Sequence, residues 1–384
     1  MKKTSPFMFY MLYFAAVAFY MPFIVLYFQG LGFNGAQIGL LTGIAPLITI
    51  VGAPLWTGLA DKKNRHKLIM SLTILAAIAL AIIFPMLTTL IPVLLVVGLF
   101  SLFSAPIISF ADSATMNMLA NEKEMYGRVR IGGTIGWGLV APVAGMLVQA
   151  RGISMAFWGY AALMFVTLII SQKFTFGQSV TVVSFKGDVR KMLSNHRWVF
   201  FLCLAFLGGV AFATVNTYLF PYMQELGASK TTMGIALTIS TLGELPVLFF
   251  ANLLLKRFKA YGLFIIGITI TGIRLLLYAA FNFPAGILFF QLLNGMTFPM
   301  VWVAGVSYAD ENSPADMKAS AQGLWGVMVF GFGAAMGGVA GGLLLGSYGG
   351  RLMYLVIGII TLVSVATVAL LDKLDRTRQA RSLI

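Results

Sequence analysis

Twelve apolar runs, each long enough to cross a lipid bilayer, leave few other folds open to this chain. About 20 apolar residues wound as a helix span the hydrocarbon layer. Backbone polar groups must be paired within lipid, and a helix pairs them inside one segment. We therefore predict an all-α membrane protein with twelve transmembrane helices. The runs cover residues 6–28, 36–60, 67–89, 91–119, 125–149, 153–172, 198–223, 230–255, 260–281, 284–309, 318–345 and 350–371.

Composition and motifs exclude several classes of protein. The chain is 59% hydrophobic and 10% charged, whereas soluble proteins carry about 25% charged residues. No phosphate-binding loop or metal-ligand spacing occurs, and the single cysteine, Cys203, implies no disulfide. His66 and His196 are the only histidines, and no nucleophile or base clusters with them. We expect no enzyme, no metal and no cofactor, with a proton as the coupling ion.

The distribution of basic residues predicts the orientation in the membrane. A net charge of +14 could suggest a nucleic-acid partner, but the charges lie in loops between apolar runs. With the N-terminus inside, 21 of the 26 Lys and Arg residues fall in inner segments, against only Arg151, Lys230 and Arg351 outside. Basic loops stay cytoplasmic. We expect both termini in the cytoplasm, the inner or plasma membrane as location, and the lipid bilayer rather than nucleic acid as partner.

A polar, basic loop at 173–197 divides the runs into six and six. We predict an N-terminal six-helix domain at 1–172, a cytoplasmic linker, and a C-terminal six-helix domain with a tail at 198–384. Residues Val189–Leu193 of the loop favour a short surface helix, although a plain linker is the alternative. Spans five and eleven are both rich in glycine, which allows close helix approach. Two pseudo-symmetric domains that rock about a central site follow from this pattern.

A few ionisable residues lie within the apolar runs. Arg130 starts span five, Asp112 lies in span four and Glu244 lies near the middle of span eight. A charge in lipid is costly unless it is paired or faces a wet cavity, so we predict that these residues face a central cavity and bind a polar solute. Trp137 shares a helix face with Arg130. The alternatives are a structural ion pair, a structural acid and a packing indole.

Further cavity candidates come from other spans. Asn294 lies one turn beyond Gln291 on the same face of span ten, and Asn216 lies in span seven. Tyr20 precedes Pro22 in span one, and we place it on the cavity. With the charged residues above, these side chains form the predicted substrate site.

The loop after span two carries a family resemblance. Gly58, Asp61 and Lys62, followed by Arg65 and other basic residues, resemble the inner-loop signature of the major facilitator superfamily. The resemblance implies the major facilitator fold and a gating role for these four residues, in which Asp61 accepts from a helix terminus or a neighbouring basic residue. The alternative is a basic loop that only sets topology.

The charged set is similar to the lactose permease branch of that superfamily. The branch has an acid in span four, an arginine 18 residues on and a tryptophan seven further; Asp112, Arg130 and Trp137 match this spacing. Glu244 and Arg274 match its span-eight acid and span-nine arginine. The resemblance implies sugar binding and proton coupling, with Glu244, Asp112 and Arg274 in the coupling set. The charged residues of span ten in that branch are absent here, where Gln291, Asn294 and Thr297 stand.

A second resemblance leaves the solute open. Asp112, the stretch Tyr126–Arg130 and the Gln291–Leu293 opening of span ten also resemble the phenylpropionate permease group. That resemblance implies a carboxylate on Arg130 and an aromatic ring on Trp137. We therefore predict a proton-coupled symporter of a sugar or oligosaccharide, with an aromatic-acid permease or an exporter of similar solutes as alternatives. A membrane sensor on the same fold is the alternative outside transport.

Overall fold

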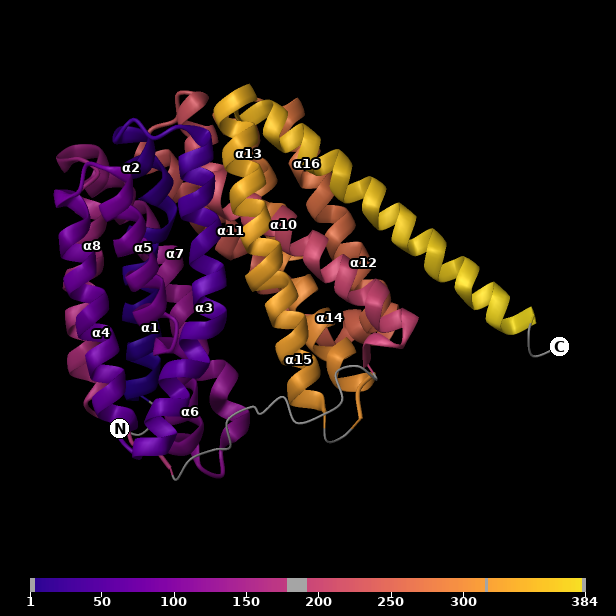
Figure 1. The fold of residues 1–384 in the computed structure, drawn as a ribbon, viewed down its shortest axis with the longest axis horizontal. Coiled ribbons are helices and arrows are strands. Elements are labelled where there is room, and N and C mark those ends of the chain that lie inside the picture. Colours follow the sequence, from indigo (N-terminus) through magenta and orange to yellow (C-terminus); the bar gives the residue numbers. More distant parts are fainter. Residues whose placement is uncertain (1–3, 178–191, 315–316, 382–384) are drawn as a thin grey trace.

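The computed structural model describes residues 4–177, 192–314 and 317–381, and most of these residues are helical (Figure 1). No strand occurs among them. The all-α prediction is confirmed. Much of the predicted linker at 173–197, including most of the predicted surface helix Val189–Leu193, lies outside the described residues.

The first half of the chain forms six crossing segments, two of which are broken into shorter helices. Its elements are α1 (Thr4–Tyr20), η1 (Met21–Phe23), α2 (Ile24–Gly30), α3 (Gly35–Lys63), α4 (His66–Ile83), η2 (Phe84–Met86), α5 (Leu90–Ser104), α6 (Ile107–Leu119), η3 (Lys123–Met125), α7 (Tyr126–Arg151) and α8 (Met155–Ser171).

The second half repeats this plan with more interruptions. Its elements are α10 (His196–Glu225), α11 (Lys230–Phe249), α12 (Ala251–Ala280), α13 (Pro284–Phe290), η4 (Gln291–Met296), α14 (Phe298–Glu311), α15 (Lys318–Gly326), η5 (Val327–Gly333) and α16 (Ala334–Arg381).

Twelve crossing segments result when the longest helix is divided at its bend. Ten segments of the described residues are long and apolar enough to cross a membrane, and Met155–Ser171 is a shorter apolar helix. The segment Ser320–Leu374 counts once among the ten, but it turns at Gly349, whose φ of 77° suits glycine. A similar turn at Lys259 separates a short helical piece from span nine. The predicted twelve-helix architecture is therefore present.

Three spans predicted as continuous are interrupted within the bundle. Span one has a 3₁₀ turn at Met21–Phe23 that contains Pro22, and span four breaks before Ile107 at Pro106. Proline lacks the amide that continues a helix. Span ten passes through the 3₁₀ segment Gln291–Met296 between two α-helices. Short 3₁₀ stretches within helices often mark functional positions, and this one carries two predicted site residues.

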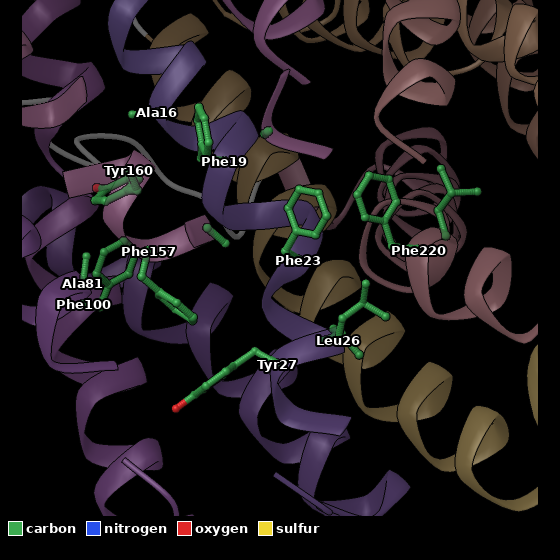
Figure 2. Packing of buried hydrophobic residues seen from close by; sticks show 14 of the residues in the cluster. Ala16, Phe19, Phe23, Leu26, Tyr27, Ala81, Phe100, Phe157, Tyr160 and Phe220 are labelled. Carbon is green, nitrogen blue, oxygen red and sulfur yellow. The ribbon is translucent and has the colours of Figure 1, made fainter. Parts of the chain in front are cut away.

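Aromatic side chains fill the interior of the first half. Phe84, Phe100, Phe157 and Tyr160 pack ring against ring; the Phe84 and Phe157 centroids, for example, lie 5.2 Å apart. Figure 2 shows most of this cluster on one side of α1 and Phe23 on the other, turned toward Phe220 of α10. The Phe23 and Phe220 rings meet edge to face at 5.0 Å. Phe23 therefore joins the two halves, while the cluster belongs to the first half alone.

The halves touch along two seams at the same end of the bundle. Gly35, Gly39 and Gly43 of α3 lie against the first part of α16, where a Cβ on Gly342 would lie 2.6 Å from Gly39 Cα. Gly145 of α7 lies against the start of α11 at Lys230. In Figure 1 the halves meet in the upper part of the view and diverge toward the marked N-terminus. The glycine seams thus hold the halves together at one end, the closed end, and the ribbons of the two halves diverge toward the other, the open end (Figure 1).

Candidate functional site

Arg130 and Asp112 form a partly exposed ion pair in the first half. Nη1 of Arg130, on α7, donates to both carboxylate oxygens of Asp112, on α6, at 2.8 and 3.0 Å. The side chains are 36% and 33% exposed. A charge inside a span needs a partner or water. Each charge has the other as its partner, and part of both charged groups stays accessible to a ligand.

Two tyrosines fix the geometry of this pair. The Tyr10 hydroxyl donates to Asp112 Oδ1 at 2.6 Å, and Arg130 Nη1 donates to the Tyr126 hydroxyl at 2.7 Å. The guanidinium also lies 5.7 and 5.9 Å from the two ring centroids, within cation–π range. All hydrogen bonds of Arg130 to described residues use Nη1. Nη2 and Nε thus have no hydrogen-bond acceptor among the described residues.

The sequence indicates that one of these tyrosines, Tyr126, lies close to Arg130. Tyr126 precedes Arg130 by four residues on the same helix, a spacing that brings side chains together. Tyr10 lies 102 residues from Asp112 and gave no local signal. Our sequence reasoning singled out neither residue as part of the site.

A second guanidinium lies buried in the second half. Arg274, on α12, is 2% exposed. Its Nε donates to the Tyr278 hydroxyl at 2.7 Å, and its Nη1 donates to Asn294 Oδ1 at 2.6 Å. Nη2 donates to Gln291 Oε1. Two helical segments, α12 itself and η4, therefore hold the charge in place, and all these acceptors are neutral.

Asn294 connects this guanidinium to Glu244. Its amide nitrogen donates to Glu244 Oε1 at 2.7 Å, while its oxygen accepts from Arg274. A buried charge without an opposite charge is strongly unfavourable, and Glu244, when it is ionised, supplies that opposite charge one side chain away. The Asn294 amide thus lies between Arg274 and Glu244 and links them through two hydrogen bonds.

Close backbone contact positions Glu244 beside Asn294. A Cβ on Gly295 would overlap the carbonyl of Gly243, and a Cβ on Gly243 would meet the carbonyl of Leu292. Only glycine fits such an approach. The glycines before Glu244 and after Asn294 therefore let α11 and η4 come close enough for the hydrogen bond.

The α7–α11 seam relates the two clusters. The Thr238 hydroxyl donates to the Gly138 carbonyl at 2.7 Å, and Thr241 packs beside the same glycine. Trp137 precedes Gly138, and Glu244 follows Thr241 by one turn toward the open end. Arg130 lies two turns from Trp137 in the same direction, about 10 Å along the helix. The predicted residues of spans five and eight thus lie on facing helices, on the open side of the seam.

Trp137, Asn216 and Asn294 are three other residues of the predicted substrate site. Trp137 and Asn216 are half-buried, and the Asn216 amide donates to its own helix at Phe212 O, at 2.9 Å. Asn294 is 8% exposed and lies behind Glu244. Trp137 therefore keeps an accessible face beside the seam, whereas Asn216 already has a backbone partner.

Two predicted cavity residues lie elsewhere, which corrects the sequence analysis. The Tyr20 ring packs inside the first half, 4.7 Å from Phe100 and 5.5 Å from Tyr160. The break at Met21–Phe23 turns Phe23, not Tyr20, toward the second half. Gln291 is 1% exposed and holds Arg274, so it supports the site from behind. Its Nε2 has no partner among described residues.

The predicted gating loop carries an acid–histidine contact. Asp61 Oδ1 lies 2.7 Å from Nε2 of His66, the first residue of α4. His66 also stacks on Phe176 at 5.4 Å. Lys62 and Arg65 are exposed, and a Cβ on Gly58 would meet open space. The role of this loop in gating stays a prediction, with His66 as a partner that the sequence analysis did not assign.

The comparisons with known proteins agree with this architecture. The chain is 26% identical to the maltose permease of Geobacillus stearothermophilus over 98% of its own length and 96% of the relative. It is 24% identical to a probable 3-phenylpropionic acid transporter of Escherichia coli, over 78% and 80%. The solved structure of the nucleoside transporter NupG superposes with a TM-score of 0.84 at 18% identity, covering 97% and 99% of the two chains.

The fold and these likenesses define a multi-pass membrane transporter of the major facilitator superfamily, not an enzyme. No cluster of metal-ligating side chains occurs in the described part of the chain. The chain belongs to the MFS_1 like family, whose model matches residues 5–356.

Proposed function

We propose that this transporter is a proton-coupled symporter of a small polar organic solute, with a sugar or oligosaccharide as the first candidate. The observation that carries the proposal is the placement of Arg130, with its pair Asp112, and Glu244 on the facing helices α7 and α11. A solute between the halves would contact both. Rocking of the halves about the seams would then expose the solute to alternate sides of the membrane.

Arg130 and Trp137 are the proposed contacts to the solute. The free Nη2 and Nε donors of Arg130 suit the hydroxyl oxygens of a sugar, and an indole face suits the C–H surface of its ring. The likeness to the maltose permease over nearly the whole chain supports this class. Asn294 and Asn216 are second contacts that open to the solute only if the halves shift.

Glu244 is the proposed proton carrier, with Asp112 as the second candidate. Closing the open end would bury Glu244 further, and burial of a charged carboxylate is more costly than burial of its neutral form. Movement of the halves is therefore favoured when Glu244 holds a proton. Protonation of Glu244 changes the charge near Arg274, because Asn294 is hydrogen-bonded to both side chains. The proton is thereby linked to the interior of the second half.

An aromatic carboxylate is the second candidate solute. Phe212 and Phe298 stack at 4.6 Å, and Trp302 and Phe330 extend the same aromatic group over spans seven, ten and eleven. A guanidinium with two free donors also suits a carboxylate. The likeness to the probable 3-phenylpropionic acid transporter supports this reading.

We further propose that both termini are cytoplasmic, because of the excess of basic residues on the N-terminal side. The open end would then face the cytoplasm. Import and export use the same geometry, so direction follows from the gradients. The membrane would be the inner or plasma membrane, and the working unit a monomer.

The test uses purified protein in two steps. Thermal stabilisation across sugars, aromatic acids and nucleosides first identifies the solute. Proteoliposomes with an imposed proton gradient then compare wild type with Glu244→Gln. We expect the variant to exchange solute across the membrane but not to accumulate it against a gradient. If Glu244→Gln accumulates solute as wild type does, Glu244 is not the proton carrier.

A further inference from the structure

A groove lies on the outer edge of the first half, away from the transport pathway. It has a volume of about 850 Å³ and runs between α4 and α8. These helices lie at the left edge of Figure 1, on the far side from the second half. The groove is therefore separate from the contact between the halves, where the solute site is proposed.

The groove is basic at one end and apolar at the other. Arg65 and Lys67 line the end where α4 begins, and Leu75 and Phe165 line the deeper part. Leu75 lies about 12 Å along α4 from Lys67. The hydrogen bond from Gln172 Nε2 to Ser71 Oγ, at 2.9 Å, marks the boundary between the two parts.

The apolar part faces outward. Leu68, Leu75, Phe165 and Ile169 are between 46% and 56% exposed. In a membrane protein, outward-facing apolar side chains of this kind contact acyl chains. The basic end lies at the level where α4 starts and α8 ends, and we expect the membrane surface at this level because charged side chains precede the apolar part of α4.

Aromatic contacts keep the basic end in shape. Phe176 stacks on His66, and the buried Phe174 packs against Phe9 of α1 with centroids 4.9 Å apart. Asn117 of α6 donates to the Thr175 carbonyl at 3.0 Å. The segment after α8 is thus tied to three other elements and closes the groove at this end.

We propose that this groove binds an anionic phospholipid, with its phosphate at Arg65 and Lys67 and an acyl chain along Leu75, Phe165 and Ile169. Basic pockets beside transmembrane helices attract anionic headgroups. The apolar wall favours a lipid over a free phosphate, because an acyl chain can pack against the wall whereas a small anion cannot.

The experiment counts lipids retained on the purified full-length protein by native mass spectrometry. Wild type is titrated with phosphatidylglycerol and, separately, with phosphatidylcholine of the same chain length. Each basic residue near an anionic surface changes affinity by about fivefold. We therefore expect Arg65→Gln with Lys67→Gln to weaken phosphatidylglycerol binding by about 30-fold.

Two further variants separate the possible outcomes. Lys256→Gln with Arg257→Gln removes the same charge from the corresponding connection of the second half, the short helical piece before Lys259, and should leave binding unchanged. Ile169→Trp fills the apolar wall without changing charge and should weaken binding. The proposal is wrong if the first pair behaves like the control pair, if phosphatidylcholine binds equally, or if glycerol phosphate displaces the lipid at equal concentration.

Discussion

Gly342→Ala is expected to open the closed end of the bundle. Gly342 faces α3, and a methyl group there would lie 2.6 Å from Gly39 Cα and N and 2.7 Å from the Gly35 carbonyl oxygen. These are backbone atoms, so no side chain can rotate away. The helices must separate, or the contact must break.

Gly342→Ala destabilises only the conformation in which the halves touch at the closed end. Overpacking a close contact costs about 1–3 kcal/mol, and this contact exists only while the halves touch at this end. The closed arrangement therefore loses about 1–3 kcal/mol relative to an arrangement open at this end. That is roughly a 5- to 150-fold change in their ratio.

Spin-label distance measurement detects this shift. Thr88 and Asn282 are exposed and lie in loops of the two halves at the closed end. Cysteines there, in a Cys203→Ser background, report the separation of the halves. We expect Gly342→Ala to move population to longer distances.

Gly326→Ala is the matched control. It makes the same change in span eleven, where an added Cβ meets no atom within 4 Å, and its distance distribution should match that of the parent. If Gly342→Ala also matches the parent, the glycine seam does not hold the halves together and our reasoning about the closed end is wrong.

Substitutions at three further positions test the site and its support. Arg130→Lys keeps the charge but loses the planar donor set, and we expect solute affinity by calorimetry to fall about 10- to 150-fold, the value of one charge-assisted hydrogen bond; an unchanged affinity would make Arg130 structural. Asn294→Leu leaves the Arg274 guanidinium and the Glu244 carboxylate without their link. Thermal melting in detergent should show a loss of about 1–3 kcal/mol, and a wild-type melt would show that the network contributes nothing. Tyr20→Ala should cost about 3–5 kcal/mol in the same assay through the cavity it leaves, whereas Tyr20→Phe should transport as wild type does. Defective transport by Tyr20→Phe in a stable protein would show that Tyr20 belongs to the solute site.

The sequence predicted the spans, and indicated Asp112 as a partner of Arg130, because lipid constrains both. Apolar runs of fixed length have few alternatives to helices. Charged residues inside them are so few that Asp112 was a natural partner for Arg130. The Glu244–Asn294–Arg274 network was harder to predict, since its central contact depends on two glycines that bring α11 against η4.

Tyr20 and Gln291 were misplaced for a shared physical reason. Hydropathy shows that a helix is in the membrane, but its rotation about its own axis is set by packing. In spans that are apolar all round, polar residues face either the pathway or the interior of one half. Tyr20 and Gln291 face the interior. Tyr10, from a part of the chain 102 residues away, reached Asp112 through the same packing.

A structure of the transporter with its solute bound, determined by electron cryo-microscopy in a lipid nanodisc, addresses the solute site most directly. We predict solute density between α7 and α11 on the open side of their seam, within hydrogen-bond distance of Arg130 Nη2 or Nε and against the face of Trp137. Density elsewhere, with Arg130 still bonded only to Asp112 and Tyr126, would contradict this account of the site.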